Sequence, residues 1–445
     1  MLLTPEEVRE ITAARLGASR ADGCIVRVGG SDSLNLRFAR NSATTNGAGS
    51  EVSVTIVSQI GQRSGSVTVT SLDAGALAEA QARSEAIARL APEDSEQMPP
   101  LGAQDYETAG ASYDDATAAV HAASLAAAAK TVIGEAVAKN VDAAGFAKVG
   151  ASFQAMATST GLFAYDRETA ARFSATARNK AGTWSGWSGA SEFRFDRLDA
   201  GRIARRAIGK SAQDMAPVDL DPGKYTVILE PAAVGELVQW LLWSLDARQA
   251  DEGRGFMSRK GGGNRLGEKL FGETVTITSD PHDAAVPAMV YGEDGLPQRR
   301  TVWVENGVVK NLCYSRYWAR KMEREPLSSP GSLVMTGGTA SIEDMIRGTK
   351  RGILVTRVWY TNIVDPQTLL LTGLTRDGNF LIENGQIVAP ARNLRFNESL
   401  VAMLSSIIAA GPSERSHGGD IGEQAISVPP LMVDGFTFSS RSSGI

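Results

Sequence analysis

Histidine and cysteine are scarce in this sequence of 445 residues, which contains three histidines and two cysteines. Cys24 and Cys313 cannot build the disulfide framework of a small secreted domain, so we expect a cytoplasmic location. His121, His282 and His417 stand far apart in the chain, and none is followed by glutamate. The paired histidines of a helical zinc-hydrolase motif are therefore missing.

An excess of one charge and long apolar runs are also missing. Lys and Arg number 45 against 50 Asp and Glu, and the formal charge is −5. Nucleic-acid binding relies on clustered Lys and Arg, which this balance does not favour. The longest apolar stretches, Leu237–Leu245 and Leu400–Ala410, are shorter than the roughly 20 residues that span a bilayer. We therefore predict neither a nucleic-acid partner nor a membrane partner.

Motifs for nucleophilic catalysis and for phosphate binding are absent as well. No G-x-S-x-G elbow occurs; Ser188 comes nearest, but alanine stands where the second glycine is required. The glycine-rich segment Gly261–Glu268 ends on an acid where a phosphate-binding loop has lysine. Cys24 belongs to an alternating strand pattern and is expected to be a small buried residue.

The first half combines strand patterns with Ala-rich helices. Thr4, followed by proline and by Glu7, is a helix start with a capping box rather than a secretory signal. Alternating apolar residues over 23–70 predict strands, and the Ala-rich segments 73–90 and 114–139 predict two helices. The tandem Trp184–Gly189 predicts a loop whose indoles either fold back on the sheet or line the rim of a ligand site.

A change of composition at Asp219–Gly223 predicts a domain boundary. Beyond it, strand patterns dominate, and Asn-Gly pairs at 306 and 384 predict hairpins. We therefore predict an α+β fold of ordinary globular composition. The N-terminal domain, residues 1–218, mixes strands and helices, and the C-terminal domain, residues 219–445, consists of large, mainly antiparallel, barrel-like sheets.

Several blocks of the chain resemble the TldD/PmbA (TldE) family, once called modulators of DNA gyrase and now grouped with metallopeptidases. The most specific is Leu371–Gly385, which is followed by Arg392–Ser399. Shorter blocks agree with it, namely Gly223–Pro231, Gly255–Met257, Leu266–Glu268 and Thr276–Pro281. The resemblance covers nearly the whole chain.

The resemblance also implies a zinc motif that this chain has lost. TldD-type members carry H-E-x-x-x-H on a helix; two histidines and a downstream cysteine hold zinc, and the glutamate is the general base. Here Gly235 and Trp240 stand at the histidine positions and Ile421 at the cysteine position. Glu236 is the sole remnant of the motif. We therefore assign no catalytic residue and no metal ligand, and expect zinc only in a TldD-type partner.

The function implied by the resemblance is that of a TldE/PmbA-like subunit that is inactive alone. Such a subunit joins a TldD-type zinc-bearing chain in a heteromer that cleaves unfolded or extended peptides, completes the assembly and helps to hold the substrate. Without this partner, a homodimer is expected. Two alternatives stay open: a stand-alone, self-assembling peptide-binding or scaffold protein, and a peptidase with an unrecognised site. Because the helix no longer faces a metal, Trp240, Leu241 and Trp243 are expected to fill the core.

Overall fold

The computed structural model describes residues 1–211, 215–417 and 425–442. The helices are α1 (Pro5–Ala18), α2 (Ala74–Leu90), α3 (Asp115–Ala118), α4 (Ala122–Ala138), α5 (Ala200–Ser211), α6 (Pro231–Trp243), α7 (Ala247–Asp251), α8 (Arg316–Lys321), α9 (Ile342–Gly348) and α10 (Leu400–Ser405). The strands are β1 (Gly23–Ala39), β2 (Ser42–Ile60), β3 (Arg63–Val69), β4 (Val141–Thr158), β5 (Phe163–Asn179), β6 (Ser185–Glu192), β7 (Gly223–Leu229), β8 (Ile277–Ser279), β9 (Thr301–Glu305), β10 (Val308–Val309), β11 (Ser332–Met335), β12 (Arg351–Asp365), β13 (Leu370–Glu383), β14 (Gln386–Pro390), β15 (Leu394–Ser399), β16 (Ile407–Ala410), β17 (Glu414–Arg415), β18 (Ala425–Val428) and β19 (Leu431–Arg441). The predicted α+β class is confirmed.

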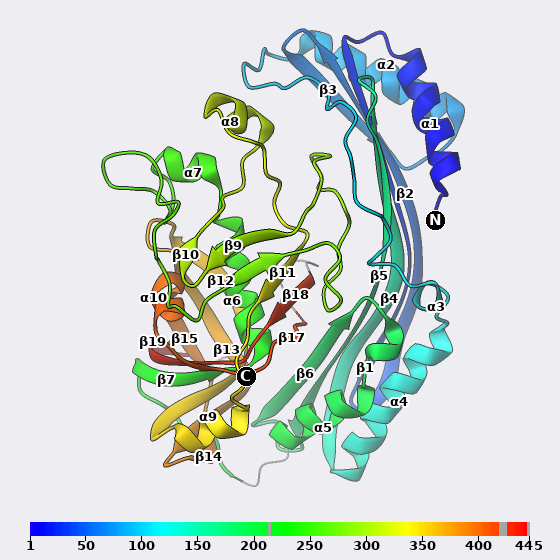
Figure 1. The fold of residues 1–445 in the computed structure, drawn as a ribbon. Coiled ribbons are helices and arrows are strands. Elements are labelled where there is room, and N and C mark those ends of the chain that lie inside the picture. The colour runs from blue at the N-terminus through cyan, green and yellow to red at the C-terminus, as the bar shows by residue number, and fades with distance from the viewer. Residues whose placement is uncertain (212–214, 418–424, 443–445) are drawn as a thin grey trace.

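The first half forms one long, curved antiparallel sheet of six strands in the order β3-β2-β1-β4-β5-β6. Helices α1, α2 and α4 pack on its outer face, and the second half of the chain lies against its inner face (Figure 1). The predicted start of α1 is confirmed, because Thr4 and Glu7 form a capping box. This layering makes the inner face of the sheet one wall of any site between the two halves.

Apolar side chains fix the helices on the outer face because strand residues of one parity point towards them. Val8 of α1 and Leu77 of α2 pack with Val26, Val28 and Ile56 of the sheet, all of which are buried. A second cluster places α4 and α5 on strands β4 and β5. Both clusters lie on the side of the sheet away from the second half.

Two local predictions for this half are wrong. The helix expected over 114–139 is two helices, α3 and α4, and His121 is the N-cap of α4 instead of a residue inside a helix. The Thr117 hydroxyl bonds both the Asp114 carboxylate and the Phe195 amide, which holds the break in place. The segment expected to be a loop at Trp184–Gly189 mostly belongs to strand β6, which pairs with β5.

The second half contains two further sheets, as expected for a mainly β domain. One is a mixed sheet in the order β10-β9-β8-β11-β18-β17. In the other, β12 pairs with both β7 and β13, so that β12, β7, β19, β15 and β13 form a ring. Helix α6 packs between the two sheets and shares their core. The domain boundary between residues 218 and 219 stays a prediction. Among the described residues, no helix has the length and apolarity to cross a membrane.

Candidate functional site

Helix α6 carries the positions of the implied motif and is buried on nearly every side. Its sequence is apolar except at Glu236 and Gln239, which suits a helix enclosed by a core. Glu230 is its N-cap, and Lys210 Nζ of α5 lies 2.7 Å from Glu230 Oε2. Burial lowers the pKa of Lys210, and the charge of Glu230 acts in the opposite direction. A carboxylate here also suits the helix dipole, so this ion pair fixes the start of α6.

Gly235 lies against Ser416, the residue that follows β17. A Cβ atom at Gly235 would stand 2.7 Å from Ser416 Oγ and 3.1 Å from Ser416 Cβ. Ser416 is buried, and its hydroxyl donates a hydrogen bond to the Pro231 carbonyl oxygen at 3.0 Å. Any side chain at this point of α6 would therefore have to displace the Ser416 side chain, and an imidazole does not fit while Ser416 keeps its position.

Glu236, which the resemblance implies to be the remnant of the motif, is 1% exposed. A general base must reach a water molecule or a proton beside the bound substrate. Glu236 does not line the clefts described below. We therefore assign it no chemical step.

Trp240 and Trp243 are more exposed to solvent than was expected for core residues. Leu241 is fully buried, but Trp240 is only partly buried and Trp243 is 45% exposed. The two indoles meet edge to face, with ring centroids 5.2 Å apart. Trp240 packs on the core from one side. The expectation that all three side chains fill the core is therefore wrong for Trp243, which lies at the rim of a cleft.

The residues at the motif positions do not fit a zinc ion. Gly235 has no side chain, and the indole of Trp240 offers a hydrogen-bond donor but no lone pair for a metal. Ile421 lies outside the described residues. Within the ranges 1–211, 215–417 and 425–442, no three His, Cys, Asp or Glu side chains gather closely enough to hold a metal ion. We derive no step through zinc in this chain.

A continuous trough runs between the inner face of the first sheet and the second half. It consists of three clefts of about 290, 460 and 690 Å³. The first two share Arg27 and Met156, and the last two share Gln154, Tyr291 and Glu293. Strands β1, β2 and β4 supply one wall, while the loop 288–298, the end of α6 and the start of α8 supply the other. The C-terminal part of the motif helix thus reaches the trough, although Glu236 does not.

The largest cleft of the trough is rich in hydrogen-bond acceptors. Gln239 and Tyr291 are 2% and 6% exposed there, and the structure gives Gln239 Oε1 and the Tyr291 hydroxyl no partner among the described residues. Burial raises the pKa of Tyr291, so its hydroxyl is protonated at neutral pH. Burial also raises the pKa of Cys313 to about 12, and the charges of Asp246 and Asp294 act in the same direction. The local potential is therefore negative.

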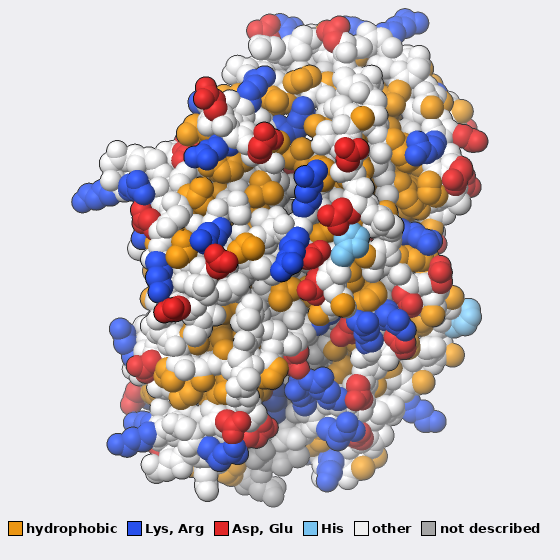
Figure 2. Space-filling model, in the orientation of Figure 1, with side chains coloured by type: hydrophobic (Ala, Val, Ile, Leu, Met, Phe, Trp, Pro, Cys, Tyr) orange, Lys and Arg blue, Asp and Glu red, His pale blue; other side chains and the backbone are white. Residues whose placement is uncertain are grey.

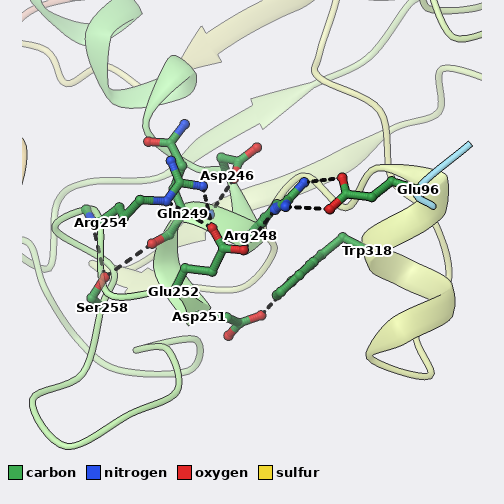
Figure 3. Close-up of polar contacts among 10 residues, drawn as sticks. Glu96, Asp246, Arg248, Gln249, Asp251, Glu252, Arg254, Ser258 and Trp318 are labelled. Atoms are coloured by element: carbon green, nitrogen blue, oxygen red, sulfur yellow. Dashed lines mark hydrogen bonds and ion pairs between the residues drawn. The ribbon is translucent and has the colours of Figure 1, made fainter. Parts of the chain in front are cut away.

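A polar cluster around α7 ties the two halves together beside this cleft (Figure 3). Arg248 donates to both carboxylate oxygens of Glu96 at 2.6 and 2.7 Å, and Glu96 belongs to the connection that follows α2. The Arg248 guanidinium also lies over the Trp318 ring, and the Trp318 indole donates to Asp251. Two planar groups in bidentate contact have a defined geometry, so this cluster fixes the position of α7 and α8 relative to the first half.

Asp166 of β5 fixes the loop 288–298, which forms part of the second wall of the trough. Its side chain is fully buried and accepts backbone N–H groups from Gly110 at 2.8 Å, Arg167 at 2.7 Å and Val290 at 2.9 Å. Burial raises the pKa of this carboxyl group, and the three N–H bonds act in the opposite direction. Because Val290 precedes Tyr291, this carboxylate positions the loop that carries the acceptor-rich lining.

Sequence reasoning missed the trough residues Gln239, Tyr291 and Asp294. A signal for Gln239 was present, since it is one of two polar residues in an apolar helix and lies one helical turn after Gly235. Tyr291 and Asp294 lie in an irregular loop, and only the tertiary structure brings them to α6. The structure therefore places the candidate site one turn after Gly235, the first of the implied motif positions.

Comparison with known proteins agrees with this fold. Residues 106–214 match the PmbA/TldA metallopeptidase central domain, and residues 222–440 match the PmbA/TldA metallopeptidase C-terminal domain. A protein named metalloprotease from Methanothermobacter thermautotrophicus is 24% identical over 250 residues, 53% of each chain. Metalloprotease MJ0996 of Methanocaldococcus jannaschii is 24% identical over 46% of this chain and 48% of its own. The matches thus span about half the length of these curated relatives.

Solved structures share the fold over nearly the whole chain. TldE from Thermococcus kodakarensis superposes with a TM-score of 0.84 at 18% identity, over 98% of this chain and 100% of its own. A Thermotoga maritima protein named as a modulator of DNA gyrase gives 0.83 at 16% identity, over 97% and 100%. With both the central and the C-terminal domain recognised, the chain belongs to the PmbA/TldD metallopeptidase family.

Proposed function

We propose that this chain is a non-catalytic, TldE/PmbA-like subunit of a TldD/TldE-type metalloprotease, and that its trough helps to hold an unfolded or extended peptide. The observation that carries the proposal is the packing of Gly235 against Ser416. A metal-activated water requires several ligands that converge on the ion. At Gly235, where the family's motif would begin, Ser416 occupies the space that the first histidine side chain would need.

The trough supports the peptide-holding part of the proposal. Its wall carries side chains of β-strands, which offer polar groups at regular intervals, such as Ser53, Thr55 and Gln154. An extended peptide has its own regular series of N–H and C=O groups, and the three connected clefts give it continuous space. On the face shown in Figure 2, acidic and basic side chains are interspersed, without a broad area of one sign.

The test is a reconstitution of peptide cleavage. This chain, a TldD-type chain with an intact H-E-x-x-x-H motif, and their mixture are each incubated with a fluorogenic unfolded peptide. We expect cleavage only in the mixture, together with a complex in size-exclusion chromatography. A TldD-type chain whose motif glutamate is replaced by glutamine serves as the control for contaminating proteases, and its mixture should be inactive.

A pair of variants tests the trough itself. Gln154→Arg places a long cation in the wall that two clefts share and should lower the cleavage rate of the mixture. Gln62→Arg makes the same chemical change in the exposed turn between β2 and β3 and should leave the rate unchanged. Cleavage by this chain alone would favour a peptidase with an unrecognised site. Peptide binding without any complex or gain in the mixture would favour the stand-alone binding protein.

A further inference from the structure

The largest cleft of the trough contains two buried polar groups to which the described residues offer no hydrogen-bond partner. Gln239 Oε1 can only accept, and the Tyr291 hydroxyl can accept or donate. Both side chains are more than nine-tenths buried and line the 690 Å³ cleft. More than nine in ten buried polar groups in proteins are paired, because an unmet group loses its hydration without compensation. The cleft therefore lacks a donor that a bound molecule can supply.

The charges around these two groups have one sign. The cleft is lined by Glu168, Asp246, Glu293 and Asp294, and no Lys, Arg or His lines it in the part of the chain that the structure describes. Asp246 Oδ1 accepts the Gln249 amide at the start of α7, and Asp294 Oδ1 accepts the Leu296 amide and the Ser328 hydroxyl.

Two basic groups are electrostatically linked to these acids: Arg27 to Glu293 and Asp294, and Arg316 to Asp294. Both arginines line neighbouring clefts instead. Burial lowers the pKa of Arg27, and these two acids act in the opposite direction. Since neither arginine lines the largest cleft, its four acidic side chains surround Gln239 and Tyr291, and no Lys, Arg or His among the described residues lines it.

The remaining walls are apolar or aromatic. Leu242, Met289 and Leu327 lie beside Trp243 and Tyr314. Methylene groups gain free energy by leaving water for such walls, and an ammonium or guanidinium group is attracted to aromatic faces. The lining thus combines an apolar passage with a negatively charged, acceptor-rich end.

We propose that this cleft is a subsite for a primary ammonium or guanidinium group on an apolar stem, held by Gln239, Tyr291 and the carboxylates of Asp246 and Asp294. Where the stem is the lysine or arginine side chain of an extended peptide, the inference rests on the proposed function and gives it a substrate preference. A free alkylamine presents the same chemistry, so the cation site is testable by itself.

The experiment uses the full chain and two kinds of probe. Saturation-transfer NMR compares n-butylamine with n-butanol, which has the same stem without the charge. Fluorescence anisotropy compares labelled decapeptides that differ at one central position, occupied by lysine, arginine, norleucine or glutamate. We expect butylamine but not butanol to bind, and the lysine and arginine peptides to bind roughly tenfold more tightly than the norleucine peptide, as for a hydrogen bond to a charged group.

Variants assign the effect to the cleft. Gln239→Leu removes the buried unpaired acceptor at similar volume, so the fold is not at risk, and Asp294→Asn removes one charge. Each should reduce the preference for lysine over norleucine to about twofold or less. Glu343→Gln, on the exposed surface of α9, is the matched control and should keep the full preference.

The outcomes separate this inference from the proposed function. Equal binding of all four peptides, with no butylamine signal, overturns the cation subsite and leaves peptide holding intact. Butylamine binding that Gln239→Leu abolishes, without binding of any peptide, supports the subsite and removes the proposed function. An undiminished lysine preference in both Gln239→Leu and Asp294→Asn places the cation elsewhere and overturns the inference.

Discussion

Replacing Gly235 by alanine should destabilise the protein, although the same change stabilises most helices. In a helix interior, alanine is favoured over glycine by about 1 kcal/mol. Here the new Cβ would lie 2.7 Å from Ser416 Oγ and 3.1 Å from Ser416 Cβ. Overpacking costs roughly 1–3 kcal/mol, and displacing the Ser416 hydroxyl from the Pro231 carbonyl oxygen costs about 1 kcal/mol more. We therefore expect the free energy of unfolding to fall by about 1–3 kcal/mol in total.

The assay is urea unfolding followed by tryptophan fluorescence, with the change read from the midpoint at constant slope. Gly134→Ala in α4 is the matched control, because a Cβ there meets no atom within 4 Å. It should stabilise by about 1 kcal/mol. In a Ser416→Gly background, Gly235→Ala should become stabilising as well, which a double-mutant cycle reports as a coupling between the two residues. If Gly235→Ala stabilises as much as Gly134→Ala, the packing argument is refuted.

Four further outcomes are expected. Trp240→Ala should lower the free energy of unfolding by about 2 kcal/mol, which is less than the roughly 3–5 kcal/mol expected for a fully buried tryptophan. Trp243→Ala should lower it by less than about 1 kcal/mol, because this side chain is exposed. Equal urea midpoints for the two variants would contradict this. Asp166→Ala leaves three backbone N–H groups without their acceptor and should cost about 3 kcal/mol in urea unfolding, whereas a change below about 1 kcal/mol would show that water replaces the carboxylate. Because burial raises the pKa of Cys313 to about 12, its thiol stays protonated below that pH. Cys313 should therefore react slowly with a disulfide reagent from pH 7 to 10. Fast reaction at pH 7.5 would refute the assigned burial. Gly235→His combined with Trp240→His should bind no zinc, because position 235 has no room; one equivalent of zinc in elemental analysis would count against the fit.

The parts of the fold that local chemistry determines were predictable. The capping box of Thr4 and Glu7 uses neighbours three residues apart, and α1 begins where expected. The Ala-rich pattern before residue 139 also predicted helical structure correctly. The break between α3 and α4 was not predictable, because it depends on a hydrogen bond between the Thr117 hydroxyl and Phe195, which are 78 residues apart. Strand β6 was likewise missed because small, polar residues form it, and only pairing with β5 makes it a strand.

The candidate site was less predictable than the fold. The resemblance directed attention to α6 and to the ligand positions that it implies, but the trough depends on where four separate segments meet. Gln154, Gln239, Tyr291 and Tyr314 come from a strand, a helix and two loops. A sequence pattern cannot show that the Gln239 acceptor has no donor nearby in the described part of the chain, because this depends on which residues the tertiary structure places around it. Trp243 shows the same limit, since an apolar residue at a rim has the same sequence signal as one in a core.

The ring of strands in the second half has a consequence for synthesis of the chain. Strand β7 is made first and pairs with β19, the last strand, so about 200 residues must be translated before the ring can close. At roughly 5–20 residues per second, this delay is on the order of 10–40 s. During that interval α6 has been made but lacks the core of β18 and β19 that covers it. The nascent chain therefore presents an apolar helix to the cell for tens of seconds, and the yield of folded protein should depend on chaperones that cover it.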